Sequence, residues 1–354
     1  MINYEALLIA VLFNIFLNLI AIKFWGGFEF VKHYEKVYSG IQKIHSKKII
    51  PRLGGLNSYL SLVLYASIST LHSNYFLITL LFSLLILVIY STKEDIAHNV
   101  TPYKRILSIF LTSFIFLIAY KNLNLPIIDA PILGKILNIY VIAFVFFIFA
   151  LVSIANGTNI IDGANGLSGM TVLFQLISLL ILADKVSDTF IYSNLIILIV
   201  FLVVFLAFNF PIGKIFLGDS GAYMWGWISG LMVILFYGRH PELPTWGAIV
   251  ILIYPIIETI FSTIRKKFYE NISPLTPDPY HLHLKVYFFL QKLLRSKRIK
   301  LSANNIVTLA LLPIWSSPLY LIPFVYSDNF LITLALLYVC ILYFTIYIFT
   351  PRVK

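Results

Sequence analysis

Residues 190–210 read FIYSNLIILIVFLVVFLAFNF, a run of 21 residues that contains no charged side chain. A helix needs about 20 predominantly apolar residues to cross the hydrocarbon core of a bilayer, so this run predicts one membrane-spanning helix. Comparable runs recur along the whole chain. The predicted fold class is therefore all-α, a polytopic integral membrane bundle of about eleven transmembrane helices, with ten as the alternative count. The eleven predicted spans lie at about 5–25, 53–72, 75–91, 106–120, 137–155, 169–184, 190–210, 222–238, 246–264, 304–325 and 330–350.

The composition agrees with this class of protein. Of the 354 residues, 60% are hydrophobic and 12% are charged, whereas soluble domains carry about a quarter charged residues. No stretch reads as a linker, a repeat or a low-complexity segment, so residues 1–354 are predicted to form a single integral membrane domain. The one cysteine, Cys340, lies in an apolar run and indicates no disulfide framework.

The basic residues predict the orientation. No lysine or arginine precedes the first apolar run and Lys23 follows it, so we expect a retained helix with its N-terminus outside, not a signal peptide. In that orientation 22 of the 26 lysine and arginine residues lie on the cytoplasmic side. The net charge of +11 then reflects membrane topology and contact with anionic headgroups or phosphates, and nucleic acid is excluded as a partner.

Five polar clusters interrupt the apolar pattern, and all of them fall at predicted cytoplasmic ends or loops. Because charges are costly in hydrocarbon, such groups usually line a cavity or a water-facing surface. The first cluster is Lys93, Glu94 and Asp95, at the end of the third span. Adjacent carboxylates repel each other, which favours a bound divalent cation or a catalytic base, although a solvated loop pair is the simpler alternative.

The second cluster, residues 156–167, reads NGTNIIDGANGL. Its glycines let a ligand approach the backbone, while amides and a carboxylate face one pocket. The alternative is a simple turn between helices. The residues that would face the pocket are Asn156, Asn159, Asp162 and Asn165.

The third cluster, residues 216–221, reads FLGDSG and contains Asp219. A carboxylate between glycines at a helix start suits a Mg²⁺ ion that keeps water and phosphate as its other ligands. The alternative is an ordinary helix N-cap, because aspartate and serine are preferred there.

The fourth cluster, residues 277–283, reads PDPYHLH and lies in the most basic loop. His281 and His283 are two residues apart and do not share a helix face, so a helical zinc pair is disfavoured. Imidazoles beside Lys285 suit contact with phosphate, and the alternatives are a solvated loop or contact with anionic lipid. The fifth cluster, residues 43–55, reads KIHSKKIIPRLGG and by itself is a positive-inside anchor.

In this order and on one side, the five clusters resemble the polyprenyl-phosphate N-acetylhexosamine-1-phosphate transferases of glycosyl transferase family 4. This family includes the phospho-N-acetylmuramoyl-pentapeptide transferase and the enzymes that begin O-antigen, teichoic acid and capsule synthesis. The resemblance covers about residues 43–285, and its NxxNxxDGxxGL and GDSG segments are the specific ones. Glu94 and Asn165 stand where the family usually has aspartates, as in the surface-polysaccharide-initiating branch associated with lipopolysaccharide and cell wall biogenesis.

The resemblance implies a phosphotransferase that moves an N-acetylhexosamine-1-phosphate from a UDP-sugar to undecaprenyl phosphate. UMP is released and a lipid-diphosphate-sugar forms. The implied cofactor is Mg²⁺, with Mn²⁺ as a substitute, and UDP-GlcNAc is the default donor. The implied location is the bacterial cytoplasmic (inner) membrane with the active site on its cytoplasmic face. A homodimer is compatible with the resemblance.

The resemblance also implies roles for individual residues. Asp219 would be the principal Mg²⁺ ligand, and Asp95 or Glu94 would orient or deprotonate the lipid phosphate. Asn209 would hydrogen-bond the uracil and Phe216 would stack on it. Asp162 and Asn165 would border the nucleotide. His281 and His283 would lie near the diphosphate, and Lys47 or Lys48 would contact the substrate.

Two alternatives stay open at this point. Direct attack by the lipid phosphate is preferred, but a two-step route through a carboxylate–phosphate intermediate is compatible with the same residues. A polytopic transporter or lipid flippase without transferase activity would also be an apolar bundle. Transporters place polar sites near the bilayer midplane, whereas here only Glu258 lies deep within a predicted span.

Overall fold

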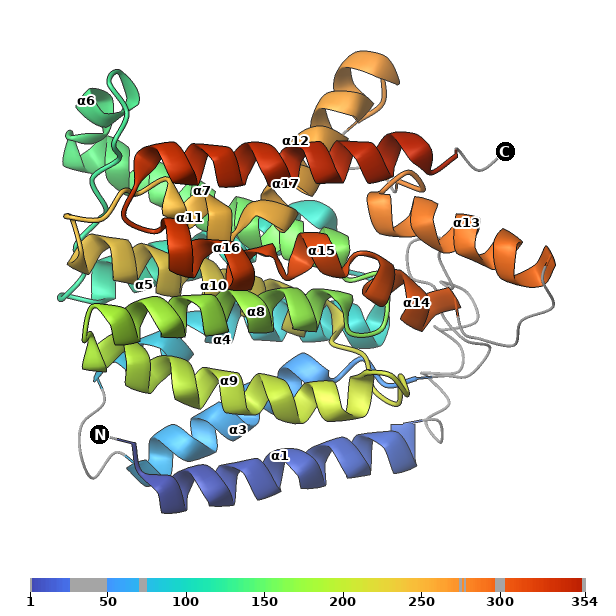
Figure 1. Ribbon diagram of the computed structural model, residues 1–354. Helices are drawn as coiled ribbons and strands as arrows, with labels where there is room; N and C mark the ends of the chain where they lie inside the picture. The colour runs from blue at the N-terminus through green and yellow to red at the C-terminus, as the bar shows by residue number, and fades with distance from the viewer. Residues whose placement is uncertain are drawn as a thin grey trace.

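The computed structural model describes residues 2–25, 50–69, 75–273, 276, 278–296 and 303–351, and within these ranges every regular element is helical. Figure 1 shows a bundle of long helices that run side by side, with the N-terminus at one end and the C-terminus at the other. The elements are α1 (Tyr4–Phe24), α3 (Gly54–Ser69), α4 (Tyr75–Ala97), α5 (Pro102–Ala119), α6 (Leu133–Leu137), α7 (Tyr140–Ile161), α8 (Leu167–Lys185), α9 (Thr189–Asn209), α10 (Gly218–Arg239), α11 (Gly247–Ile251), α12 (Ile253–Ile264), the π-helix η3 (Arg265–Tyr269), α13 (Leu282–Ser296), α14 (Ala303–Ala310), α15 (Leu312–Trp315), α16 (Ser317–Val325) and α17 (Asn329–Phe349).

The all-helical, polytopic membrane bundle is confirmed, and the described part of each predicted span is mainly helical. The predicted count of eleven is not confirmed. In the described part of the chain, eight helices are long and apolar enough to cross a membrane, or nine if the pair α14 and α15–α16, bent by 46°, is one span. The second predicted span falls short because the described part of α3 has 16 residues. The side on which the N-terminus lies stays a prediction.

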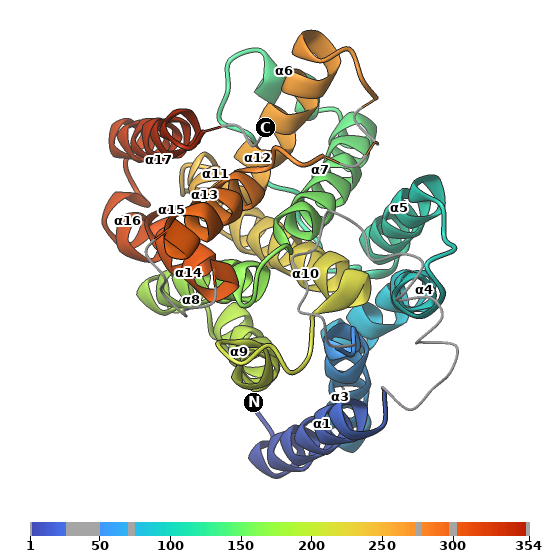
Figure 2. The same cartoon turned by 90° about the vertical axis from the view of Figure 1, so that its right-hand side faces the viewer.

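The ninth predicted span, 246–264, is broken at Leu252 into α11 and α12. Proline has no N–H to donate and its ring collides with the carbonyl four residues earlier. Pro255 therefore removes the helical bond to Ile251, where α11 ends. Figures 1 and 2 both show α12 leaving the bundle after this break.

Helix α10 lies at the centre of the bundle. In its apolar stretch 94% of the residues are buried, whereas only 22% are buried in the apolar stretch of α17. Small residues let its neighbours approach closely, as is usual between membrane helices. A Cβ on Gly226 would lie 2.5 Å from the Thr158 hydroxyl of α7, and one on Gly230 would lie 3.1 Å from Ile154. These contacts set the spacing of α7 and α10, whose ends carry two of the polar clusters.

Helix α1 is bound to α3 by polar side chains inside the bundle. The Asn14 amide donates to the Asn57 carbonyl at 3.1 Å and to the Ser61 hydroxyl at 3.0 Å. The Asn57 amide donates to Asn18 at 2.8 Å, and Asn18 donates to Asn14 at 2.9 Å. Because all four side chains are buried, each amide finds its partner within the protein, as hydrocarbon requires.

Candidate active site

The acid cluster at the end of α4 meets the first turn of α10. Asp95 is 2% exposed, and its Oδ1 and Oδ2 accept hydrogen bonds from the backbone N–H groups of Asp219 and Ser220 at 2.7 and 2.9 Å. The carboxylate therefore caps the N-terminus of α10, where unpaired N–H groups and the helix dipole favour a negative charge. The hypothesis that Asp95 acts as the base is not carried by this geometry, because both oxygens are used for the cap.

Asp219 lies at the meeting point of three helices. Its Oδ2 pairs with Nη1 of Arg105, from the first turn of α5, at 2.7 Å. Its Oδ1 accepts the side-chain amide of Asn159, from the last turn of α7, at 3.2 Å. The same Arg105 nitrogen lies 3.8 Å from Oε1 of Glu94, whose Oε2 accepts the N–H of Val100 at 2.8 Å. The residues proposed from two separate clusters, Glu94 and Asp219, thus share one guanidinium.

The loop before Asp219 is held by the start of α3. The N–H groups of Gly54 and Gly55 donate to the carbonyls of Phe216 and Leu217, both at 3.0 Å. Gly218 has a φ of +76°, and a Cβ there would lie 2.5 Å from the Arg52 carbonyl. Only glycine tolerates this backbone and this close approach. The Phe216 side chain is partly exposed beside this loop.

The second cluster ends α7 and forms the turn before α8. Asn156, Asn159, Asp162 and Asn165 are all partly exposed, and they lie at the end of the bundle that also carries Asp219. The structure thus brings this cluster to the first and third clusters through the contact between Asn159 and Asp219.

Asn209 does not present its amide to a ligand in this structure. It is 5% exposed, its Oδ1 accepts the Gly166 N–H at 2.6 Å, and its Nδ2 donates to the Ile215 carbonyl at 2.7 Å. We infer that Asn209 joins the two loops that precede α8 and α10. The proposed hydrogen bond from Asn209 to uracil would require both of these contacts to be released.

The histidine cluster is organised by Glu258, the acid that the sequence places deep within a span. Glu258 is 0% exposed and accepts contacts from the His281 Nδ1 at 2.9 Å, the Leu282 N–H at 3.2 Å and the Tyr343 hydroxyl at 2.8 Å. A buried carboxylate needs such partners to stay charged. Glu258 therefore joins α12, the start of α13 and α17 at one point.

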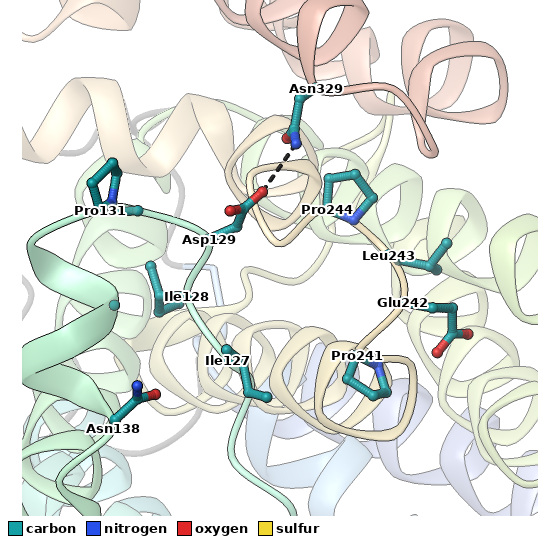
Figure 3. Close-up of a pocket in the computed structure, with 12 residues that line it drawn as sticks. Ile127, Ile128, Asp129, Pro131, Asn138, Pro241, Glu242, Leu243, Pro244 and Asn329 are labelled. Atoms are coloured by element: carbon teal, nitrogen blue, oxygen red, sulfur yellow. Dashed lines mark hydrogen bonds between the residues drawn. The ribbon is translucent and has the colours of Figure 1, made fainter.

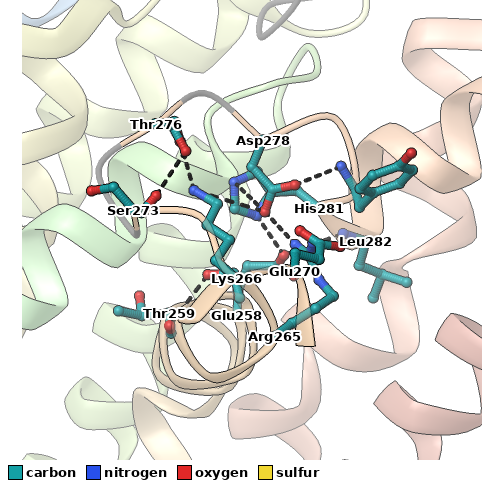
Figure 4. Close-up of polar contacts among 12 residues, drawn as sticks. Glu258, Thr259, Arg265, Lys266, Glu270, Ser273, Thr276, Asp278, His281 and Leu282 are labelled. Carbon is teal, nitrogen blue, oxygen red and sulfur yellow. Dashed lines mark hydrogen bonds and ion pairs between the residues drawn. The ribbon is translucent and has the colours of Figure 1, made fainter. Parts of the chain in front are cut away.

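A second set of ion pairs holds the loop before α13, and Figure 4 shows Arg265 and Lys266 reaching from η3 toward Asp278. Arg265 pairs with Asp278 and also with both oxygens of Glu270, at 2.8 and 2.9 Å. Burial raises the pKa of the Asp278 carboxyl, but nearby His281 and the Tyr280 N–H outweigh it, so the net pKa is lowered. Asp278 is thus ionised near neutral pH.

His283 packs against the second cluster. Its exposed fraction is 1%, and a Cβ on Gly163 would lie 2.0 Å from its Nε2, so the ring rests on the backbone beside Asp162. Burial, followed by repulsion from His281, lowers the pKa of His283 to about 3. His283 is therefore neutral at physiological pH, and its buried Nδ1 has no hydrogen-bond partner in the described part of the chain.

Lys47 and Lys48, proposed as substrate contacts, lie outside the described residues. The other proposed residues gather at one end of the bundle, on α4, α7, α9, α10, α13 and the loops between them. Sequence reasoning did not assign roles to Arg105 or to the pair Asn304 and Asn305. An arginine directly before one predicted span, and two amides at the start of another, were the available signals.

The side-chain oxygen atoms at this site are of the chemical type that magnesium prefers as ligands. Mg²⁺ prefers oxygen ligands and usually binds through one or two carboxylates, with substrate phosphates and water completing its shell. Asp219 offers a carboxylate, Asn159 an amide oxygen, and the buried hydroxyl of Ser220 has no partner in the described chain. Among the described residues no group of three or more His, Cys, Asp or Glu could hold a metal ion, so the protein alone forms no closed cage.

The opposite end of the bundle carries a different feature. A pocket of about 490 Å³ lies there, between the segment after α5 and the segment after α10, and Figure 3 shows the residues that line it. Asp129 faces it and accepts the amide of Asn329 at 2.9 Å, and Glu242 lies on the other wall. The proposed site residues are absent from its lining.

The helices and the polar end define a polytopic integral membrane protein with a carboxylate, amide and histidine site at one end of its bundle. The profile of glycosyl transferase family 4 matches residues 77–237, a range that includes Asp95, Asp162 and Asp219. Over this range the chain is similar to glycosyl transferase family 4, and the relatives that it resembles are named as sugar-phosphate transferases.

Three relatives illustrate the similarity. The probable undecaprenyl-phosphate N-acetylglucosaminyl 1-phosphate transferase of Bacillus subtilis is 25% identical over 70% of this chain and 68% of its own length. The phospho-N-acetylmuramoyl-pentapeptide-transferase of Streptococcus pneumoniae is 24% identical over 72% of this chain and 82% of its own. The undecaprenyl-phosphate alpha-N-acetylglucosaminyl 1-phosphate transferase of Thermotoga maritima is 30% identical over 39% of this chain and 41% of its own. None of these three names describes a transporter.

Proposed function

We propose that this protein transfers an N-acetylhexosamine-1-phosphate from a UDP-sugar to undecaprenyl phosphate, releasing UMP, as the first membrane step of a cell-surface polysaccharide. UDP-GlcNAc is the proposed default donor. The observation that carries the proposal is the convergence of Glu94 and Asp219 on Arg105, with Asn159 bound to Asp219, at the end of a membrane bundle. Two anionic phosphates that must meet require such a polar site beside lipid.

The donor diphosphate is proposed to bind at the start of α10. Asp219 would hold Mg²⁺ together with the amide oxygen of Asn159, and the ion, when bound, would neutralise the diphosphate and the departing UMP. Arg105, at 2.7 Å from Asp219, would then be released to contact phosphate oxygens through its guanidinium. The neutral ring of His283, fixed against Gly163, would donate a hydrogen bond without adding charge.

The acceptor is proposed to approach along the membrane, with its phosphate at Glu94. A phosphate monoester has a second pKa near 6, so it is largely dianionic at neutral pH and orientation matters more than deprotonation. Glu94 is the less buried of the two adjacent acids and keeps one oxygen directed toward Arg105. We therefore assign the orienting role to Glu94 and the helix-capping role to Asp95. Direct in-line attack needs no covalent enzyme intermediate.

The proposed location is the bacterial cytoplasmic membrane, with the active site on the cytoplasmic face. The excess of lysine and arginine at the site end supports this orientation. It also places the site where a soluble nucleotide-sugar is available. A flippase function gains no support, since the relatives that the chain resembles are named as transferases.

The test is UMP release by purified protein given UDP-GlcNAc and undecaprenyl phosphate, with Mg²⁺ or with a chelator. Wild-type protein should release UMP only with the metal. Asp219→Asn should reduce release by at least about 100-fold, since metal ions supply several kcal/mol of transition-state stabilisation. Asp129→Asn, the same chemical change at the opposite end of the bundle, should stay within about twofold of wild type. Wild-type protein that makes no UMP from any UDP-N-acetylhexosamine would contradict the proposal.

A further inference from the structure

The turn between α7 and α8 is held by side chains from α14, more than a hundred residues later. The Asn165 N–H donates to Oδ1 of Asn304 at 2.6 Å, and the Thr308 hydroxyl donates to the Asn165 carbonyl at 2.6 Å. Figures 1 and 2 both place α14 beside the start of α8. The backbone of Asn165 is therefore fixed on both its N–H and its carbonyl.

The side chain of Asn165 is fixed as well, through a chain of two amides. The Asn165 Nδ2 donates to Oδ1 of Asn305 at 3.1 Å, and the Asn305 Nδ2 donates to the Pro211 carbonyl at 2.7 Å. A carbonyl oxygen can only accept a hydrogen bond. Pro211 therefore requires the NH₂ group of Asn305 on its side, which leaves Oδ1 of Asn305 to face Asn165.

This relay decides which atom Asn165 presents to solvent. Asparagine carries an acceptor and a donor of nearly equal size, so an isolated amide can turn either one toward a ligand. Here the NH₂ group is taken by Asn305 and is enclosed by Gly213, where a Cβ would lie 2.6 Å from it. The Oδ1 atom accepts no hydrogen bond from the described chain and is not buried. Asn165 is thus held as an acceptor.

We propose that Asn305 is a positioning residue that makes Asn165 a hydrogen-bond acceptor for the N3–H of the donor's uracil, and so selects uridine over cytidine nucleotides. This rests on the proposed function, which puts the diphosphate at Asp219, and on the contact of Asn159 with Asp219, which brings the cluster that contains Asn165 to that diphosphate. Uracil carries N–H at N3, whereas cytosine carries a lone pair there. An acceptor facing N3 attracts the first base and repels the second.

The experiment compares the binding of UMP and CMP to detergent-purified protein by calorimetry, and so does not depend on turnover. Wild-type protein should prefer UMP. Asn305→Ala frees the Asn165 amide to rotate, so the ratio of the CMP to the UMP dissociation constant should fall by about tenfold, within the usual worth of one such hydrogen bond. Thr308→Val removes a bond to the same turn but leaves the relay in place, so its ratio should equal that of wild type.

A second variant separates the relay from general damage to the fold. Aspartate at position 165 is an acceptor on both oxygens and needs no relay. The double variant Asn165→Asp with Asn305→Ala should therefore recover the preference for UMP that Asn305→Ala loses. An unchanged ratio in Asn305→Ala, or no recovery in the double variant, would overturn the inference while leaving the proposed function in place. Wild-type protein that binds neither nucleotide would overturn both.

Discussion

Asp95 caps the helix that begins with Asp219, and the two carboxylates are joined through the backbone N–H of Asp219 at 2.7 Å. The two adjacent acids of α4 therefore differ in surroundings. Asp95 is enclosed and uses both oxygens on α10, whereas Glu94 faces Arg105. Neighbouring residues on a helix point about 100° apart, so this division of roles follows from helix geometry.

Asp95→Asn should lower both stability and activity. The amide keeps one acceptor but turns its NH₂ toward the second N–H of α10, at a cost of roughly 1.5–3 kcal/mol of unfolding free energy. The weakened cap should also displace Asp219 by a fraction of an ångström or more. This displacement should reduce UMP release by up to about 100-fold. Thermal unfolding and initial rates measure the two effects. Glu94→Gln is the matched variant and should lower turnover alone. An unchanged melting temperature in Asp95→Asn would contradict the capping role.

Glu258→Gln should disturb the histidine cluster. Glutamine retains one acceptor oxygen for three donors and turns an NH₂ group toward one of them. The free energy of unfolding should therefore fall by about 3 kcal/mol, as when a buried charge network is broken. Tyr343→Phe removes one of the three bonds and should cost about 1 kcal/mol. Chemical denaturation of both variants provides the comparison. If Glu258→Gln proves no less stable than Tyr343→Phe, Glu258 is not the organising residue.

The pH dependence of stability should carry a contribution from His283. Its folded pKa, about 3, is below the ordinary value of 6.5, so the unfolded chain takes up a proton that the folded chain does not. The stabilisation is complete above pH 6.5 and declines as pH falls, at about 1.4 kcal/mol per pH unit.

The other carboxyl groups, including Asp278 with its lowered pKa, are the same in wild type and in a His283 variant, so the difference between the two proteins from pH 4.5 to 6.5 isolates the histidine. His283→Gln cannot titrate there. Melting temperatures of wild type and this variant should therefore converge as the pH is lowered through that range. Parallel curves would show that His283 is not held neutral.

Gly226→Val should separate α7 from α10 and weaken the contact between Asn159 and Asp219. A Cβ at Gly226 already lies 2.5 Å from Thr158, next in sequence to Asn159. We expect UMP release to fall by about tenfold or more, because the two ligand-bearing helices move apart. Ala207→Val, on the exposed face of α9, is the control and should have no effect. Full activity in Gly226→Val would show that the helix spacing is not limiting.

Asp188→Asn should lower stability without changing catalysis. Asp188 caps α9 and pairs with Arg239 at 2.6 Å, at the end of the bundle that does not hold the site. Asparagine keeps the cap through its Oδ1 but turns an NH₂ group toward Arg239 and His240, so the loss should be about 1 kcal/mol, discounted because Arg239 is partly exposed. The KM for UDP-GlcNAc and the turnover of folded protein should match wild type, and a changed KM would indicate coupling between the two ends.

The apolar spans and the gathering of polar clusters at one end could be predicted from sequence, because lipid imposes both patterns strongly. The break of the ninth span could not, since a proline within an apolar run is compatible with a kinked or a broken helix. In the structure α11 ends at Ile251, and the chain then leaves the bundle as α12, with Pro255 in its first turn.

Side-chain partners were harder to predict. Asp95 and Glu94 are equivalent in sequence, and only the position of α10 distinguishes the capping acid from the acid that faces Arg105. The family motif implies that Asn209 contacts the uracil base, whereas in the structure its amide joins two loops. Asn305 gave no periodic signal, because its partners are more than ninety residues away.

The amides that join α1 to α3 have a practical consequence for expression of the protein. Helix α1 is largely lipid-exposed, so it is a helix that one would ordinarily delete from a shortened form of the protein. Its bonds to Asn57 continue, within one turn of α3, to Gly54 and Gly55, which grip the loop before Asp219. Truncated forms should therefore begin no later than Asn3, and fusion tags are better attached at the other terminus.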